Sequence, residues 1–299
     1  RRPGRRRGSG IVARGPLEEG LASIRGVDPN AGGDAQKELD VVAEERIKAA
    51  LLPTPTAFLA SEESEELIPL NPEGRLVIAV DPLDGSSNID TNVSVGTIYS
   101  ILPYAPAVHT DPVSAVMRRG VNQVASGFVA YGPATILVAT FGEGTQVFVH
   151  DPQTGEFVLA RTNVEIPAET KEYGVNQSNG RHWAPPLSAY IADCLAGKAG
   201  PRGKDFNMRW VGSMVADAFR IFTRGGVYVY PGDKRKGYEN GRLRLIYEAN
   251  PVAFLTEQAK GAATDGKTRI LDIEPHHIHQ RIPLVFGSKA EVEKIASYY

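Results

Sequence analysis

The sequence is most informative at residues 80–88, which read Val-Asp-Pro-Leu-Asp-Gly-Ser-Ser-Asn. The apolar run Leu76–Val80 predicts a strand that leads directly into these acidic residues. Asp81 and Asp84 flank a proline-containing turn, so both carboxylates, together with the Leu83 carbonyl, can bind one cation. Oxygen ligands without cysteine or histidine favour Mg²⁺ or Mn²⁺ over zinc.

Phosphate is the second ligand that this stretch predicts. A turn or helix start after Asp84 leaves backbone N–H groups from which a phosphate can accept hydrogen bonds, namely those of Gly85, Ser86 and Ser87. No neighbouring histidine suggests a hydrolase triad, so the two serines are not expected to be nucleophiles. Taken alone, the stretch is also typical of a solvated turn, because Asp-Pro and Asp-Gly are common turn formers.

A second strand is predicted to end in acidic residues. The apolar run Ala57–Ala60 leads into Ser61, Glu62 and Glu63, and adjacent carboxylates repel each other unless a cation or solvent screens them. Two such strand ends can hold more than one divalent ion, the arrangement that clamps the attacking and leaving oxygens in phosphoryl transfer. Metal binding therefore becomes the favoured interpretation of both strand ends.

The remaining pattern predicts an α/β protein of two tightly packed parts. Residues 37–52 have one apolar face, which predicts a helix with Asp40 beside the apolar stripe. Residues 93–164 are mostly strand-like, with the clearest hairpin strand at Thr145–His150, and predict a largely antiparallel sheet. Helices and strands alternate afterwards, including a helix at 187–195, a helix at 213–223, strands at 227–230 and 243–247, and a helix at 251–260. We expect a basic disordered tail (1–10), an N-terminal metal-binding domain (11–164) and a C-terminal sugar-phosphate domain (165–299).

Composition excludes several classes of function. The net charge of −2 argues against nucleic-acid binding. The sequence has no run of about eighteen apolar residues, so it does not predict a membrane-spanning helix. The single cysteine, Cys194, cannot form an internal disulfide and fits a reducing, cytoplasmic location. His276, His277 and His279 lack metal-ligand spacing and are expected to be loop and surface residues.

Four strings together resemble class 1 fructose-1,6-bisphosphatase. They are Ser61–Glu63, Asp81–Thr97, Trp210–Asp217 and Leu243–Pro251, and the resemblance covers the chain from about residue 17 onward. The shorter Asp-Pro-Leu-Asp-Gly-Ser is shared with the wider inositol-monophosphatase-like superfamily. The resemblance implies a layered α-β-α-β-α sandwich of the sugar phosphatase type, assembled as a homotetramer.

The resemblance also implies roles for individual residues. Mg²⁺, two or more ions per subunit with Mn²⁺ as a substitute, is implied to bind Glu62, Asp81, Asp84, Glu248 and the Leu83 carbonyl. Glu63 and Asp40 are implied to be acid/base partners, and Asp34 to join the site when its loop closes. The sugar and its 6-phosphate are implied to contact Asn176, Tyr230, Arg242, Arg244 and, from a neighbouring subunit, Arg209. Asn179 and Trp210 stand where the family has tyrosines, and Arg242 where it has lysine.

The predicted function is therefore hydrolysis of fructose 1,6-bisphosphate to fructose 6-phosphate by metal-activated water, in gluconeogenesis or the Calvin cycle. A dual enzyme that also accepts sedoheptulose 1,7-bisphosphate is the nearest alternative, because one extra hydroxymethylene is hard to reject by pocket size. An inositol-phosphate or nucleotide-bisphosphate phosphatase shares the metal motif but not the longer strings. A non-catalytic sugar-phosphate sensor is a further alternative, which the complete set of carboxylates argues against.

Overall fold

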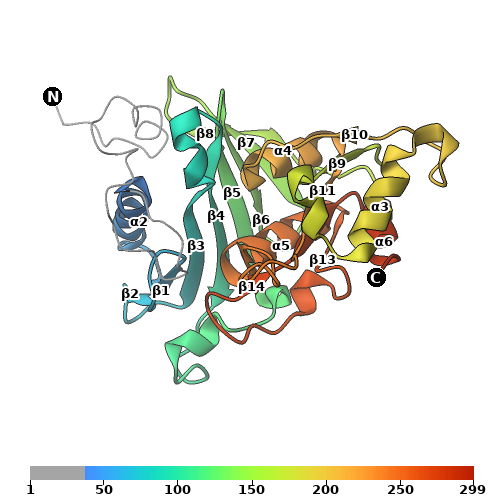
Figure 1. Ribbon diagram of the computed structural model, residues 1–299. Coiled ribbons are helices and arrows are strands. Elements are labelled where there is room, and N and C mark those ends of the chain that lie inside the picture. Colours follow the sequence, from blue (N-terminus) through green and yellow to red (C-terminus); the bar gives the residue numbers. More distant parts are fainter. Residues whose placement is uncertain (1–37) are drawn as a thin grey trace.

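The computed structural model describes residues 38–299, and within this range two large sheets alternate with layers of helices (Figure 1). The first sheet has eight strands in the order β2-β1-β3-β4-β5-β6-β7-β8. Their bounds are β1 Thr56–Ser61, β2 Ile68–Pro69, β3 Leu76–Asp84, β4 Val95–Pro103, β5 Ala125–Tyr131, β6 Thr135–Thr140, β7 Thr145–His150 and β8 Phe157–Arg161. Every pairing from β3 to β8 is antiparallel, and β1 joins β3 in parallel. The predicted antiparallel sheet is confirmed, and β7 has the predicted bounds.

The second sheet has five strands in the order β10-β9-β11-β15-β13, and a two-stranded ribbon joins β12 to β14. Their bounds are β9 Glu172–Gly174, β10 Asn207–Met208, β11 Val227–Tyr230, β12 Leu243–Arg244, β13 Ala262–Thr264, β14 Arg281–Ile282 and β15 Leu284–Gly287. The helices are α2 Glu38–Leu51, α3 Pro185–Leu195, α4 Met214–Arg224, α5 Asn250–Gln258 and α6 Lys289–Ala296.

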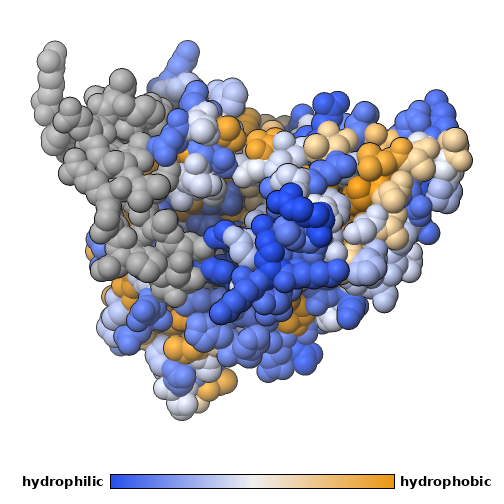
Figure 2. Space-filling model, viewed as in Figure 1, coloured by the Kyte–Doolittle hydropathy of each residue, from blue (hydrophilic) through white to orange (hydrophobic). Residues whose placement is uncertain are grey.

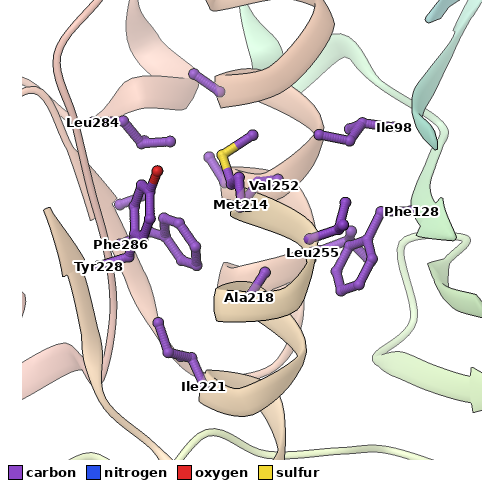
Figure 3. Close-up of a cluster of buried hydrophobic side chains, with 14 of the residues drawn as sticks. Ile98, Phe128, Met214, Ala218, Ile221, Tyr228, Val252, Leu255, Leu284 and Phe286 are labelled. Atoms are coloured by element: carbon purple, nitrogen blue, oxygen red, sulfur yellow. The ribbon is translucent and has the colours of Figure 1, made fainter. Parts of the chain in front are cut away.

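Helices α4 and α5 lie between the two sheets and form the central layer. Their apolar side chains pack against Ile98 and Phe128 of the eight-stranded sheet on one side and against Tyr228 and Phe286 of the five-stranded sheet on the other (Figure 3). The ring of Phe128 meets that of Phe222, on α4, edge to face at 6.0 Å. Truncating either ring to alanine would cost about 3–5 kcal/mol, which shows how strongly this layer holds the sheets together.

The outer layers complete the sandwich. Ile47 and Leu51 of α2 cover the far face of β1 and β3, and α3 and α6 cover the far face of the five-stranded sheet (Figure 1). The order of layers is therefore helix, sheet, helix, sheet, helix, which confirms the predicted sandwich. No helix in the range 38–299 is both long and apolar enough to cross a membrane.

Two local predictions are wrong in detail, and both concern the functional region. The expected strand at 243–247 ends at Arg244, and Leu245–Ala249 form a π-helical turn that runs into α5. A short, fully buried apolar run does not distinguish a strand from a buried helix, which explains the error. The expected turn at Asp81–Asp84 is instead the last part of β3.

Candidate active site

Strand β3 brings Asp81 and Asp84 to the same place through a bulge. Asp81 lies opposite Ile98 and Asp84 opposite Gly96, so β3 has one more residue than β4 between these pairs. In a regular strand, residues three apart point to opposite faces, and one inserted residue removes that difference. Pro82 has no N–H to donate to the ladder, which favours an irregularity at this point.

The π-helical turn supplies a third carboxylate, that of Glu248. Ligand oxygens of Asp81, Asp84 and Glu248 all lie within 4.8 Å of one another, and all three residues are buried. The backbone N–H of Arg244 donates to Glu248 Oε2 at 2.5 Å, which fixes the carboxylate at the start of the turn. π-Helical turns are rare and occur frequently at functional sites.

The three carboxylates are in an environment that opposes their ionisation. Burial and the negative charge of Glu62 raise the pKa of both Asp81 and Glu248 well above the ordinary values. Burial raises the pKa of Asp84 to about 6, although a 3.0 Å hydrogen bond from the Val215 N–H opposes that rise. Uncompensated buried charges are costly, so these donors fit a hard divalent cation, which would neutralise them and accept their oxygens as ligands.

Glu62 and Glu63 follow β1 and lie on a turn beside this cluster. The Glu62 N–H donates to the Val80 carbonyl at 3.0 Å, which ties the turn to β3. The Glu62 carboxylate lies 3.4 Å from Nε of Arg244, and the Glu63 N–H donates to Ser61 Oγ at 3.3 Å. The charge of Glu62 therefore acts on the carboxylates of the cluster, although Glu62 is not one of the three residues within 4.8 Å of one another.

The start of helix α2 approaches the acidic end of β3. Leu39 packs in one apolar cluster with Leu83, and the adjacent Asp40 is 3% exposed. The Leu83 N–H donates to Asp81 Oδ1 at 2.9 Å, so residue 83 is part of the bulge itself. Asp34 lies outside the described residues.

The predicted phosphate-binding residues follow the bulge directly. Gly85 has a φ of 75°, a left-handed conformation that suits glycine, and a 3₁₀-helix begins at Ser86. The first N–H groups of such a helix have no intrahelical acceptor, which keeps Ser86 and Ser87 as candidate phosphate donors. Asn88 Nδ2 donates to the Gly212 carbonyl at 2.9 Å and connects this segment to the loop before α4.

A small cavity brings together part of the predicted sugar-phosphate set. It is lined mainly by polar and aromatic side chains, among them Asn176, Asn179, Trp210, Tyr230, Arg235 and Tyr238. Burial raises the pKa of Tyr230, and the charge of Glu248 adds to the rise, so the cavity lies within electrostatic reach of the acidic cluster. Figure 2 shows a strongly hydrophilic centre on this side of the molecule, in the region of β11 and β14 in Figure 1.

The three predicted arginines lie in different surroundings. Arg242 reaches the cavity edge, where its Nη1 donates to the Tyr238 hydroxyl at 3.2 Å. Arg209 is exposed and its Nε lies 3.6 Å from a carboxylate oxygen of Glu172. Arg244 is 1% exposed and lies beside Glu62 and Glu248 rather than in the lining of the cavity. The alternating directions of side chains along the predicted strand did not indicate this placement.

Sequence reasoning missed several residues around the site. Arg235 and Tyr238 line the cavity, and the Arg235 guanidinium lies 4.3 Å from the centre of the Tyr238 ring. The only signal that could have identified them is the concentration of basic and aromatic residues at 234–242. The Val215 N–H, which anchors Asp84, is a backbone group and has no sequence signal.

Comparison with known proteins agrees with this geometry. Residues 15–162 match the family model "Fructose-1-6-bisphosphatase, N-terminal domain", and residues 166–299 match the corresponding C-terminal domain. The chain is 96% identical over 289 residues to a class 1 fructose-1,6-bisphosphatase of Xanthobacter autotrophicus, covering 97% of this chain and 88% of that protein. It is 72% identical over 289 residues to a class 1 fructose-1,6-bisphosphatase of Azorhizobium caulinodans, with the same coverage.

A solved structure of Leishmania major fructose-1,6-bisphosphatase in holo form is similar throughout. It superposes with a TM-score of 0.90 at 36% sequence identity and covers 97% of this chain and 89% of that one. The layered fold, the buried acidic cluster and both family models lead to the same assignment. The chain belongs to the class 1 fructose-1,6-bisphosphatase family.

Proposed function

We propose that the chain hydrolyses the 1-phosphate of D-fructose 1,6-bisphosphate, giving fructose 6-phosphate and inorganic phosphate. Relatives with 96% and 72% identity carry the name of this activity. The observation that carries the proposal is the convergence of three buried carboxylates, Asp81, Asp84 and Glu248, within electrostatic reach of a polar, aromatic cavity. A pure binding protein would have no reason to place so much negative charge near a phosphate.

We propose Mg²⁺ as the cation, with at least two ions per subunit and Mn²⁺ as a substitute. All three clustered ligands are carboxylates, and hard oxygen donors select such ions over zinc. Glu62 and the Leu83 carbonyl would complete the ligand set. When bound, the ions supply positive charge that polarises the phosphate and lowers the pKa of water.

The residues around the cluster would handle the protons and the orientation of the 1-phosphate. Glu63, paired with Asp40 and with Asp34 when its loop closes, would accept the proton of the attacking water. The new P–O bond would form on the side opposite the C1 oxygen, whose bond to phosphorus breaks, and the C1 oxygen would take a proton from solvent to become the hydroxyl of fructose 6-phosphate. Backbone N–H groups of Gly85, Ser86 and Ser87 would hold the phosphate oxygens during this displacement.

The cavity would bind the sugar and the 6-phosphate. Asn176 and Tyr230 offer polar groups there, and Arg242, supported by Tyr238, offers a planar pair of donors that matches phosphate geometry. We reassign Arg244 to the metal end, because its side chain lies at Glu62. The positive charge of the Arg244 guanidinium would offset part of the repulsion among the carboxylates.

Assembly, location and boundaries complete the proposal. We propose a homotetramer in which Arg209 reaches the active site of a neighbouring subunit, a cytoplasmic location, and a role in gluconeogenesis or the Calvin cycle. The exposure of Arg209 is compatible with such a reach. We also propose that the boundary between the N-terminal metal-binding domain and the C-terminal sugar-phosphate domain lies between residues 164 and 165.

Phosphate release from fructose 1,6-bisphosphate, with and without Mg²⁺, tests the function, with Glu63→Gln measured in parallel. We expect Mg²⁺-dependent turnover and a loss of about 10²–10⁴-fold in kcat for the variant, since general acid–base catalysis contributes that much. Absence of turnover by folded, Mg²⁺-supplemented wild type would refute the proposal. The same assay with sedoheptulose 1,7-bisphosphate tests the broader substrate range.

A further inference from the structure

Ser64, directly after the turn that carries Glu62 and Glu63, is held from two sides. Its hydroxyl donates to the carboxylate of Glu44, on α2, at 3.0 Å and 3.2 Å to the two oxygens. Its carbonyl lies 3.1 Å from Nε2 of His279, in the segment that precedes β14. Two elements far apart in the sequence therefore clamp one residue of the turn.

His279 is not the surface residue expected from the sequence. The ring is half-buried, lies over the Tyr247 ring at 5.5 Å between centroids, and is surrounded closely enough that burial lowers its pKa to about 4. The nearby positive charge of Arg244 lowers the pKa further. His276 and His277, by contrast, are exposed as expected.

The surroundings of His279 also select its tautomer. Nδ1 is buried and has no hydrogen-bond partner among residues 38–299, which suits an unprotonated nitrogen better than an unpaired N–H. The proton of the neutral ring then lies on Nε2, which donates to the Ser64 carbonyl. A carbonyl oxygen is an acceptor only, so this assignment gives a satisfied hydrogen bond.

The clamp opposes a repulsion that the site itself creates. The charge of Glu62 is among the causes that raise the pKa of Asp81 and of Glu248, so these carboxylates repel one another. The hydrogen bond from the Glu62 N–H to the Val80 carbonyl holds the first residue of the turn, and the contacts of Ser64 hold its far end against that repulsion. A hydrogen bond from a neutral donor holds it without adding a charge that would compete with a cation.

We propose that His279 is a positioning residue, which holds the Glu62–Glu63 turn against the acidic cluster through the Ser64 carbonyl. The inference rests on the proposed function, in which Glu62 binds the metal ion and Glu63 accepts a proton. Substitution of a residue that holds a metal ligand in place, without itself binding the metal, typically lowers metal affinity or activity by about 10–100-fold.

Three substitutions separate the hydrogen bond from the packing of the ring. His279→Phe keeps a ring over Tyr247 and removes the donor, His279→Asn keeps an amide donor that is too short to reach, and His279→Gln places an amide N–H near the position of Nε2. Mg²⁺ binding to the full chain is measured by titration calorimetry without substrate, and kcat and KM are measured separately. His276→Phe, at an exposed histidine of the same segment, is the control.

We expect about tenfold weaker Mg²⁺ binding and about tenfold lower kcat for the Phe and Asn variants, with KM for the sugar bisphosphate within about twofold. The Gln variant should recover most of both losses, and the control should match the wild type. A Phe variant that matches wild type while Gln is impaired would overturn the proposal, because packing alone would then explain the site. Equal Mg²⁺ binding by all variants, including no binding by any, would also overturn it. If the Phe variant does not fold, the Asn and Gln pair decides the question.

Calorimetry without substrate keeps this test distinct from that of the function. Wild type that binds Mg²⁺ but releases no phosphate would refute the proposed reaction, while the order of Mg²⁺ affinities among the variants would still support or overturn the positioning role.

Discussion

Replacing Asp84 by asparagine should stabilise the metal-free protein at neutral pH. Asp84 is buried in the fold, and its pKa is raised to about 6 from 3.8, chiefly by burial. The amide of Asp84→Asn has nearly the same shape and still accepts the hydrogen bond that Val215 N–H donates at 3.0 Å. The substitution therefore removes a charge from a site where ionisation is unfavourable, with little change in packing.

The magnitude follows from the shift in pKa. A difference of about two units, at about 1.4 kcal/mol per unit, makes the ionised wild type about 3 kcal/mol less stable than it would be with an unshifted group. Weakening of the charge-assisted hydrogen bond offsets about 1 kcal/mol, which leaves a net gain of about 2 kcal/mol for the variant. Because the folded pKa is the higher one, the cost to wild type is absent below pH 3.8, grows as pH rises, and is complete above about pH 6.

Urea unfolding at pH 7.5 in EDTA, followed by circular dichroism, measures this difference. Adding Mg²⁺ should reverse the order, because a ligand at 100 times its Kd stabilises wild type by about 2.7 kcal/mol and the variant lacks a ligand oxygen. Asp217→Asn is the matched control: burial also raises the pKa of Asp217, but this residue lies outside the acidic cluster, 3.2 Å from the Arg220 guanidinium, so Mg²⁺ should leave the stability difference between this variant and wild type unchanged. Lower stability of Asp84→Asn in EDTA at pH 7.5 would refute the reasoning.

Three further substitutions test other parts of the molecule. Tyr238→Phe removes the hydroxyl that Arg242 contacts at 3.2 Å, so KM should rise about fivefold with kcat unchanged in steady-state assays, and a fall in kcat alone would contradict this role. Arg244→Met removes the cation that lies 3.4 Å from the Glu62 carboxylate and should lower stability in EDTA by about 3 kcal/mol, whereas unchanged urea unfolding would show that this contact contributes little. Glu291→Gln breaks a buried ion pair with Arg202 at 2.8 Å, and urea unfolding should show a free energy of unfolding about 3 kcal/mol lower. Because the pair lies in the outer layer of α3 and α6, kcat should not change, and a changed kcat would indicate coupling to the active site.

The elements that the sequence predicts best are those with a strong local pattern. The strand Thr145–His150 is bounded by glycine-rich turns on both sides, and the structure has the same bounds. The helix predicted at 213–223 is Met214–Arg224 in the structure and ends at Gly225. The φ of this residue is 83°, a conformation that favours glycine because residues with a side chain rarely adopt it. Such signals need only neighbouring residues, so a sequence is sufficient to read them.

The details of the site depend on contacts that no local pattern contains. The stretch from Asp81 to Asp84 has the composition of a turn, but pairing with β4 keeps it in the strand and converts the extra residue into a bulge. His279 and Ser64 are 215 residues apart in the chain, and only the folded structure shows that they meet. The sequence did not reveal that Arg244, at the start of the π-helical turn, lies 3.4 Å from Glu62.

Neutral donors orient the acidic cluster, and they leave its carboxylates available to a cation even though burial opposes their ionisation. One oxygen of each carboxylate accepts a backbone N–H: Asp81 from Leu83, Asp84 from Val215 and Glu248 from Arg244. Such hydrogen bonds lower the pKa of each acid and fix its direction, but they do not cancel its charge. A lysine at the same distance would orient a carboxylate equally well and would then compete with a divalent cation for it. The bulge in β3 and the π-helical turn bring together the three carboxylates and the N–H groups of Leu83 and Arg244, and the first turn of α4 adds the N–H of Val215, so the geometry of the cluster depends on two irregular stretches of backbone.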